Sequence, residues 1–344
     1  MNTSVSQPLV SIVTPVYNEA PHISECIESV LAQTYQNWEY TIVDNLSTDG
    51  TFEIASRYGA TDQRIRVCRN DTFLRAIANH NAALRQISPA SKYCKIVFGD
   101  DWIFPECVER MVAVVEEYPS VGVVGAYILE GSQVTCVGLP YPSKRVSGRE
   151  ICRREFLDRL YVWGSANSVL YRSDLVRDRD PFFNEANIHA DTESCLVLLK
   201  EWDFGFVHQV LTYTRVRPDS LNAAATDIQT DMAGMLYHLQ TYGPDCLTHK
   251  ELTRRLKQHV SAYYAFLGKS AILGRNRAFW DFHKTKLKES GVGFSMARVL
   301  GGVMVTLWNA VLNPGLAIDK VLNRRNRPAA KQSGRFAKHQ EEFR

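Results

Sequence analysis

The chain has 344 residues, of which 45% are hydrophobic, a composition typical of a folded protein with one large domain or two ordinary ones. Its formal net charge of +3 is too small for this length to indicate a nucleic-acid-binding surface, so no nucleic acid partner is expected. Eight cysteines without a C-x-x-C pair indicate neither a zinc ribbon nor a disulfide framework.

The ends of the chain differ in character. Residues 1–8 are polar and lack the basic-then-apolar pattern of a secretory signal, which predicts a cytoplasmic protein. No stretch is long and apolar enough to predict a transmembrane helix with confidence. Between Asp319 and Arg344 there are eight Lys/Arg against three Asp/Glu. This basic tail is a candidate for contact with anionic lipid or another acidic surface.

Short apolar, β-branched runs alternate with segments of helical period from Leu9 onward, which indicates βαβ units around a mostly parallel sheet. The pattern predicts strands at 10–15, 40–44, 65–69, 94–98, 121–127 and 133–137. It predicts helices at 21–33, at 48–58 with Ser47 as N-cap, at 73–86 and at 149–160. After about Ala225 the patterns are almost entirely helical. We therefore expect an α/β domain at 8–225 and a helical C-terminal region with its basic tail at 226–344.

Two predicted strands end in carboxylates, at Asp44 and at Asp100-Asp101, and ligands bind at the carboxyl ends of strands in open α/β sheets. Adjacent carboxylates repel unless a cation neutralises them, so Asp100 and Asp101 are candidate ligands for Mg²⁺ or Mn²⁺ bound to a diphosphate. The alternative, with about equal weight, is that this pair caps the helix that starts near Pro105. Asp44 could accept hydrogen bonds from a base or ribose, since Ser47 or Asp49 could cap the next helix.

The segment Thr14–Glu19 joins the first strand to the first helix, where a nucleotide commonly docks. It contains no glycine-rich phosphate loop, which lowers the weight of a dinucleotide oxidoreductase or a nucleoside triphosphatase. Tyr17 could stack on a base, and packing under the loop is at least as probable. Further along, Asp191 could be a general base, although a carboxylate at a helix start is more often a cap and His189 more often structural.

Three ordered motifs resemble the inverting glycosyltransferases of family 2, which have the GT-A fold. Thr14–Ala20 (TPVYNEA) is similar to the family's T-P-x-Y-N-x-E/A run, and Ser29–Tyr35 (SVLAQTY) to its S-V-L-x-Q-T-Y run. Val43–Thr51 (VDNLSTDGT) is similar to V-D-D-x-S-T-D-G-T, with Asn45 in place of the second aspartate. The resemblance spans roughly Pro8 to Leu221 and implies a Rossmann-like, mostly parallel central sheet flanked by helices.

The resemblance also implies roles for particular residues. Four residues would line the nucleotide pocket, namely Thr14, Pro15, Tyr17 and Asp44. Asp100 and Asp101 would hold Mn²⁺ or Mg²⁺ and the ribose–diphosphate, and Asp191 would be the catalytic base. The chain departs from the family at Phe98, which replaces the first carboxylate of D-x-D-D, and at Ala190 in place of the E of the E-D pair. His80 stands where an arginine often approaches the nucleotide, and Arg217 stands where a histidine is usual and could contact the diphosphate.

The expected activity is transfer of a sugar, with inversion, from a nucleotide-sugar donor to a hydroxyl of a glycan or lipid-linked acceptor in surface polysaccharide synthesis. Two alternatives stay open: a nucleotide-sugar-binding protein with reduced catalysis, and a nucleotidyltransferase, which would need a glycine-rich basic loop. Residues 296–318 have apolar side chains at helical spacing, followed by Arg324, Arg325 and Arg327. We expect a membrane-surface helix there, at the inner face of the cytoplasmic membrane, with core packing as the equally weighted alternative.

Overall fold

The computed structural model describes residues 7–217 and 228–312, and it divides the chain into two compact units between Val216 and Arg217. The boundary expected after residue 225 falls in 218–227, outside the described residues, as does the basic tail from Asp319 onward. Each unit is described by itself.

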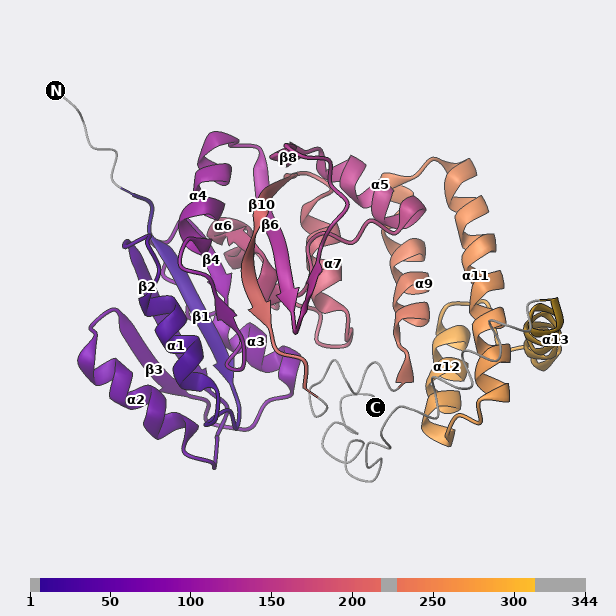
Figure 1. Ribbon diagram of the computed structural model, residues 1–344, viewed down its shortest axis with the longest axis horizontal. Helices are drawn as coiled ribbons and strands as arrows, with labels where there is room; N and C mark the ends of the chain where they lie inside the picture. The colour runs from indigo at the N-terminus through magenta and orange to yellow at the C-terminus, as the bar shows by residue number, and fades with distance from the viewer. Residues whose placement is uncertain (1–6, 218–227, 313–344) are drawn as a thin grey trace. The chain divides into compact units, whose positions relative to one another are not determined.

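The first unit begins with the four predicted strands β1 (Val10–Val16), β2 (Trp38–Asp44), β3 (Ile65–Arg69) and β4 (Tyr93–Ile96). They pair in parallel in the order β3-β2-β1-β4 (Figure 1). The crossovers contain α1 (Ile23–Leu31), α2 (Thr51–Thr61) and α3 (Ala76–Leu84). These predicted strands and helices are confirmed, with boundaries that differ by a few residues.

The sheet continues through β9 (Leu170–Arg172), which is antiparallel to β4 and to β6 (Val121–Glu130). The twelve-residue β10 (Asp203–Thr214) then pairs in parallel with β6. Short antiparallel strands complete the ten-stranded sheet: β5 (Trp102–Ile103), β7 (Gln133–Thr135) and β8 (Arg145–Val146). The longest ladders, β1–β2 and β6–β10, are parallel, so the expected α/β fold with a mostly parallel sheet is confirmed.

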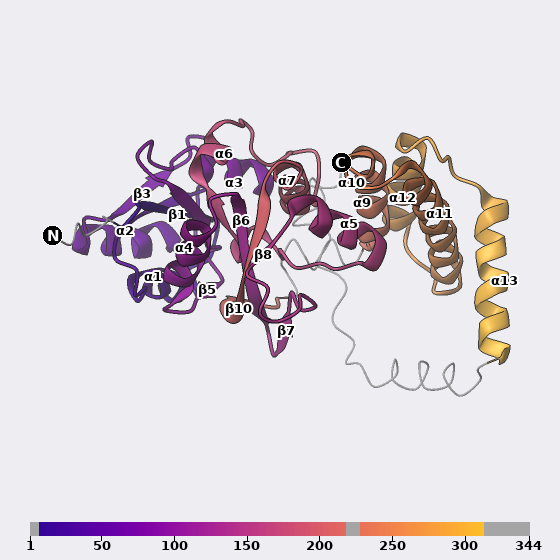
Figure 2. The same ribbon diagram turned by 90° about the horizontal axis from the view of Figure 1, so that it is seen from above.

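Alternate residues of the strands face opposite sides of the sheet. Val10, Ile12 and Val16 of β1 contribute to a buried core with α1 and with α4 (Cys107–Glu117). Figure 2 shows α1 and α4 on one side of the sheet and α3 and α6 (Ser173–Arg177) on the other. The first unit also contains α5 (Gly148–Asp158), the short helix η1 (Ala166–Ser168) and α7 (Ala190–Leu198).

The start of α2 differs from the sequence prediction. The helix begins at Thr51, with Gly50 at its N-cap in the left-handed region (φ +95°), so Ser47 as its cap was wrong. Asp49 instead accepts hydrogen bonds from the Thr51 N–H and hydroxyl. Ser47 is occupied elsewhere, because its hydroxyl accepts from the backbone N–H of Asn18.

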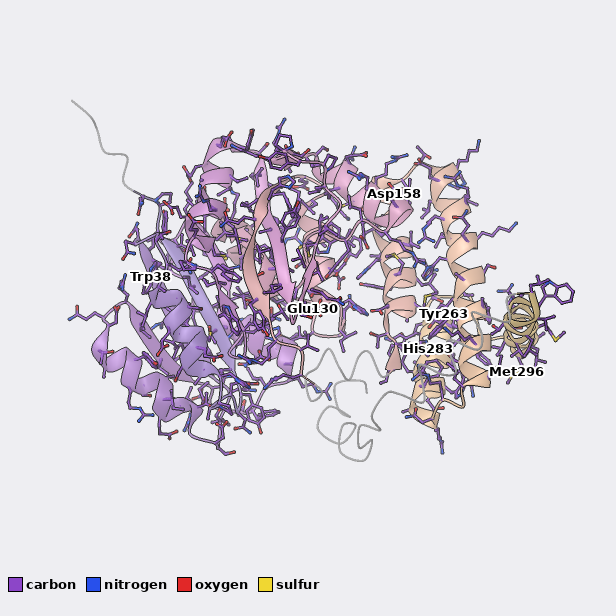
Figure 3. The ribbon with its side chains drawn as sticks, viewed as in Figure 1. Trp38, Glu130, Asp158, Tyr263, His283 and Met296 are labelled. Carbon is purple, nitrogen blue, oxygen red and sulfur yellow. The ribbon has the colours of Figure 1, made fainter. Side chains whose placement is uncertain are left out.

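The second unit is helical, as expected. Its helices are α9 (Asp231–Thr241), α10 (Gly243–Cys246), α11 (His249–Ile272), α12 (Arg277–Glu289) and α13 (Met296–Leu312). Figure 3 labels Tyr263 and His283 in its core, where the tyrosine hydroxyl lies 2.6 Å from the His283 Nδ1. Within the described ranges, none of the helices has the length and apolarity that crossing a membrane requires.

Candidate functional site

The carboxyl ends of β2, β1 and β4 form one edge of the sheet, and the predicted carboxylates lie along it. Asp44 ends β2 opposite Val16, the last residue of β1, whereas Trp38 begins β2 at the other edge (Figure 3). Gly99, which follows β4, packs so closely on Val16 that an added Cβ would lie 2.8 Å from the valine Cγ2. Val16 thus separates the Asp44 turn from the turn that contains Asp100.

The loop after β1 is fixed to the loop after β2 by reciprocal hydrogen bonds. The Asn18 N–H donates to the Ser47 hydroxyl at 2.9 Å, and the Thr48 N–H donates to the Asn18 Oδ1 at 2.9 Å. Asn18 has a φ of +53°, a conformation that asparagine tolerates better than most residues. The half-buried Tyr17 ring meets Phe73 edge-to-face, with centroids 4.9 Å apart. Tyr17 is therefore positioned at the edge by two loops.

Asp44 is fully buried, and its two carboxylate oxygens have different surroundings. The Oδ2 accepts from the Ser47 N–H at 3.1 Å and from the Arg69 Nε at 2.8 Å. The Oδ1 is covered from solvent and accepts no hydrogen bond within the described residues. A buried acceptor without a donor costs about 1–3 kcal/mol. This oxygen is a polar atom that a ligand N–H or O–H would satisfy. Arg69, whose guanidinium lies 4.0 Å from the Phe52 ring centroid, was not recognised in the sequence as its partner.

Asn45, which replaces an aspartate of the family pattern, uses both halves of its amide. The Nδ2 donates to the Leu74 carbonyl at 2.8 Å, and the Oδ1 accepts from the Leu74 N–H at 3.0 Å and from Asn70 at 2.9 Å. A carboxylate has no donor for the Leu74 carbonyl. The asparagine therefore anchors the segment that leads to Phe73 and α3.

Asp100 and Asp101 differ in their surroundings. Asp101 is 3% exposed, and its Oδ2 accepts from the Asn167 amide at 3.0 Å, while its Oδ1 accepts from the Arg215 N–H at 2.8 Å. Asp100 is partly exposed, and its carbonyl accepts from the Arg215 Nε. Asn167 in turn is tied to the fully buried Lys95, whose Nζ donates to the Asn167 carbonyl at 2.8 Å. Asn167, Arg215 and Lys95 had no assigned role in the sequence.

Thr14 and Pro15 are buried within β1 rather than exposed at its end. The Thr14 hydroxyl lies 2.8 Å from the Tyr40 hydroxyl and donates to the Val97 carbonyl at 2.7 Å. These bonds tie β1 to β2 and to the segment after β4. The Thr14 hydroxyl is therefore engaged in the core, and Thr14 can influence a ligand at the sheet edge only through the backbone conformation of β1.

His80 stacks on Phe98, with ring centroids 4.9 Å apart, so the two residues that depart from the family pattern contact each other. Burial lowers the pKa of His80 to about 4. The imidazole is therefore neutral at pH 7, unlike the arginine that the family often has. It also meets the Phe183 ring at 6.3 Å, which connects α3 to the segment that precedes α7.

Asp191 lies in the first turn of α7, and its Oδ1 accepts from the Thr192 N–H at 2.7 Å. His189 occupies the N-cap position and makes no side-chain cap bond, so Asp191 satisfies one of the otherwise unpaired N–H groups of this turn. Burial raises the pKa of Asp191, opposed in part by the Thr192 N–H and by nearby His189. A carboxylate with a raised pKa is a stronger base, which suits proton abstraction.

An electrostatic interaction and a short run of the chain link the Asp191 region to Asn167, the partner of Asp101. The Tyr161 hydroxyl, whose pKa is raised by burial and by the charge of Asp191, donates to the Gly164 carbonyl at 2.6 Å. Residues 166–168 follow as η1, which includes the Asn167 that binds Asp101. Arg217 is partly buried three residues beyond the end of β10, and it begins the second unit.

The carboxylates fit a metal ion only in part. Within residues 7–217 and 228–312 there is no group of three or more His, Cys, Asp or Glu side chains arranged to hold a cation. Both Asp101 oxygens accept protein hydrogen bonds in a buried position, whereas Asp100 is partly exposed. Mg²⁺ is commonly held by one or two carboxylates plus substrate phosphates, and this arrangement fits a cation that binds together with a diphosphate.

Comparison with known proteins agrees with this geometry. The sequence model described as Glycosyl transferase family 2 matches residues 11–163. EpsE of Bacillus subtilis is 29% identical over 221 residues, which cover 61% of this chain and 79% of EpsE. The glycosyltransferase GlyG of Streptococcus pneumoniae is 34% identical over 119 residues, but these span only 35% of this chain and 39% of GlyG.

Among solved structures, S. aureus TarS in complex with UDP-GlcNAc superimposes with a TM-score of 0.55 at 18% identity. The similarity covers 75% of this chain and 73% of the TarS chain, and it supports the shared fold. The family match begins within β1 and includes the Asp44 turn, the Gly-Asp-Asp turn and the segment that carries Tyr161. Residues 11–163 are therefore similar in sequence to glycosyltransferase family 2.

Proposed function

We propose that this protein transfers a sugar from a nucleotide-sugar donor to a hydroxyl of a glycan or lipid-linked glycan acceptor, with inversion at the anomeric carbon. The observation that carries the proposal is the buried Asp44 oxygen, which has no hydrogen-bond donor among the described residues and lies at the edge of the sheet where Tyr17 and Asp100 also lie. An N–H of a nucleotide base is a donor of the kind that this oxygen needs. Because the oxygen is covered, binding requires a small shift of the side chains over it.

In this proposal the donor nucleotide lies along the ends of β1 and β2. Tyr17 stacks on the base, and the Asp44 carboxylate accepts a hydrogen bond from an N–H of the base. Thr14 and Pro15 contribute through the backbone shape of β1. His80 approaches the diphosphate without charge of its own.

Asp100 would hold Mn²⁺ or Mg²⁺ together with the diphosphate oxygens, and Asp101 would orient this turn through its bonds to Asn167 and Arg215. When bound, such a cation supplies positive charge that stabilises the nucleoside diphosphate as a leaving group. The side chains of the protein orient the donor and transfer the proton.

Asp191 is the proposed catalytic base. Its carboxylate takes the proton from the acceptor hydroxyl, and the acceptor oxygen forms a bond to the anomeric carbon. The bond between that carbon and the diphosphate oxygen breaks, and its electron pair leaves with the nucleoside diphosphate. Attack from the face opposite the leaving group inverts the configuration. The raised pKa of Asp191 favours its role as the base.

The test is release of nucleoside diphosphate from donors, with and without Mn²⁺ or Mg²⁺, followed by assignment of the anomeric configuration of the product by NMR. UDP-GlcNAc is the first donor to test, because the TarS structure with a similar fold contains it. Metal-dependent release that is lost in Asp191→Asn is expected. Donor binding without release would favour a binding protein, and pyrophosphate formation from a nucleoside triphosphate would favour a nucleotidyltransferase.

The biological setting is also a proposal. One relative is named for the synthesis of a polymer, the teichuronic acid biosynthesis glycosyltransferase TuaG of Bacillus subtilis, which is 38% identical over 95 residues. A role in surface polysaccharide synthesis would place the acceptor at the cytoplasmic membrane. We propose that the protein works at the inner face of that membrane as a peripheral protein.

A further inference from the structure

Helix α13 of the second unit packs on α11 by direct backbone contact. An added Cβ on Gly302 of α13 would lie 2.4 Å from the Tyr264 carbonyl, and one on Gly268 of α11 would lie 2.3 Å from the Gly302 carbonyl carbon. Val299 is buried beside this crossing, with 2% of its surface exposed. Two glycines thus bring the helices together and fix which side of α13 faces α11 (Figure 2).

The opposite side of α13 is apolar and open to solvent. Eight large hydrophobic side chains there are 49–72% exposed: Met296, Leu300, Met304, Val305, Leu307, Trp308, Val311 and Leu312. At about 100° per residue they cover roughly half of the helix circumference, away from Val299 and Gly302. We refer to these eight residues as the apolar face of α13, whose first residue, Met296, is labelled in Figure 3.

Charge is absent from this face. The only charged residue between Met296 and Leu312 is Arg298, and its guanidinium lies 5.3 Å from the Tyr264 ring centroid, on the side of α11. Contiguous exposed apolar surface of this kind usually marks an interaction site. A core-packing role accounts for Val299 and Gly302 and leaves the apolar face unexplained.

We propose that the apolar face of α13 inserts into the surface of an anionic lipid membrane. The charges that follow favour lipid over a second copy of the chain. Residues 319–344 contain eight Lys/Arg against three Asp/Glu, and the cluster Arg324, Arg325 and Arg327 comes soon after the helix. Anionic lipids attract such a segment, whereas a dimer through α13 would bring two basic segments together. A helix with one side packed on α11 and the other apolar and exposed suits a helix that lies in the membrane surface.

This inference is independent of sugar transfer, because lipid binding is measured without a donor. The full chain is floated with vesicles of phosphatidylcholine alone or with phosphatidylglycerol added. We expect flotation only with the anionic vesicles, reduced by high salt. Leu307→Glu and Trp308→Glu should each weaken the partitioning by about tenfold or more, because each removes an apolar side chain that would insert into the lipid and adds negative charge.

Ile272→Glu is the matched control, since Ile272 is 48% exposed at the end of α11 and lies outside the apolar face of α13. It should float like the unmodified chain. All three substituted side chains are exposed, so unchanged melting temperatures are expected and would show that folding is preserved. Failure to float with anionic vesicles, or equal loss in Ile272→Glu, would overturn the proposal. A dimer in solution that Leu307→Glu converts to a monomer would also overturn it, in favour of a second copy.

Discussion

Replacing Asp44 with asparagine tests whether its buried carboxylate binds the donor or supports the fold. The asparagine Oδ1 is expected to take the position of the aspartate Oδ2, because the Ser47 N–H and the Arg69 Nε both donate there. The new amide nitrogen then occupies the position of the oxygen that has no donor. A base N–H that meets this nitrogen finds a donor where it needs an acceptor.

The two effects of this substitution differ in size. The unpaired oxygen costs about 1–3 kcal/mol in the ligand-free protein, and an unpaired amide nitrogen costs a similar amount. The Arg69 side chain is 36% exposed, so water can replace much of the lost charge interaction. We expect the free energy of unfolding to change by no more than about 1 kcal/mol. A lost charge-assisted hydrogen bond of about 1.5–3 kcal/mol should weaken donor binding by roughly 10–150-fold.

Calorimetric titration with the nucleoside diphosphate gives the binding constant, and urea unfolding gives the stability. Asp49→Asn is the control from the same motif, because the Asp49 oxygens accept from the Thr51 N–H and from the Ala20 N–H. It should lose about 1–2 kcal/mol of stability without a comparable loss of binding. Unchanged affinity in Asp44→Asn, together with a loss of stability like that of Asp49→Asn, would refute the reasoning.

Three other substitutions probe the remaining features. Asp191→Asn should lower kcat by about 10²-fold or more while donor affinity is retained. In the unmodified enzyme, the acid limb of the pH profile of kcat/KM should lie above the ordinary aspartate pKa of about 3.9, because the pKa of Asp191 is raised. An acid limb at or below that value would contradict the role of Asp191 as the base. His80→Arg should tighten diphosphate binding at pH 7 by about threefold or more in titrations, since His80 is neutral there, and unchanged affinity would remove His80 from the site. Asn45→Asp should cost about 1–3 kcal/mol in urea unfolding although it restores the family residue, and equal stability would refute the role of the Leu74 carbonyl bond.

Sequence patterns were sufficient to predict the parallel half of the sheet, which consists of β1 to β4. Apolar runs and helical spacing predict strands β1 to β4 and the helices between them to within a few residues. The family motifs lie in the same region. The positions of Asp44 at the end of β2 and of Asp100 beyond β4 followed from this local pattern. The start of α2 did not, because Ser47 and Asp49 were both plausible caps and the tertiary bond to Asn18 decided between them.

The tertiary structure alone decided what each carboxylate does. Asp101 accepts hydrogen bonds from Asn167, 66 residues away, and from Arg215, 114 residues away. Asp44, in contrast, has one oxygen that meets no donor in the part of the chain that the structure describes. Strand β10 was not predicted, although it pairs with β6 along most of its length. Hydrogen-bond partners and burial at such separations depend on how distant segments pack, and a periodicity read over a dozen residues contains no information about that packing.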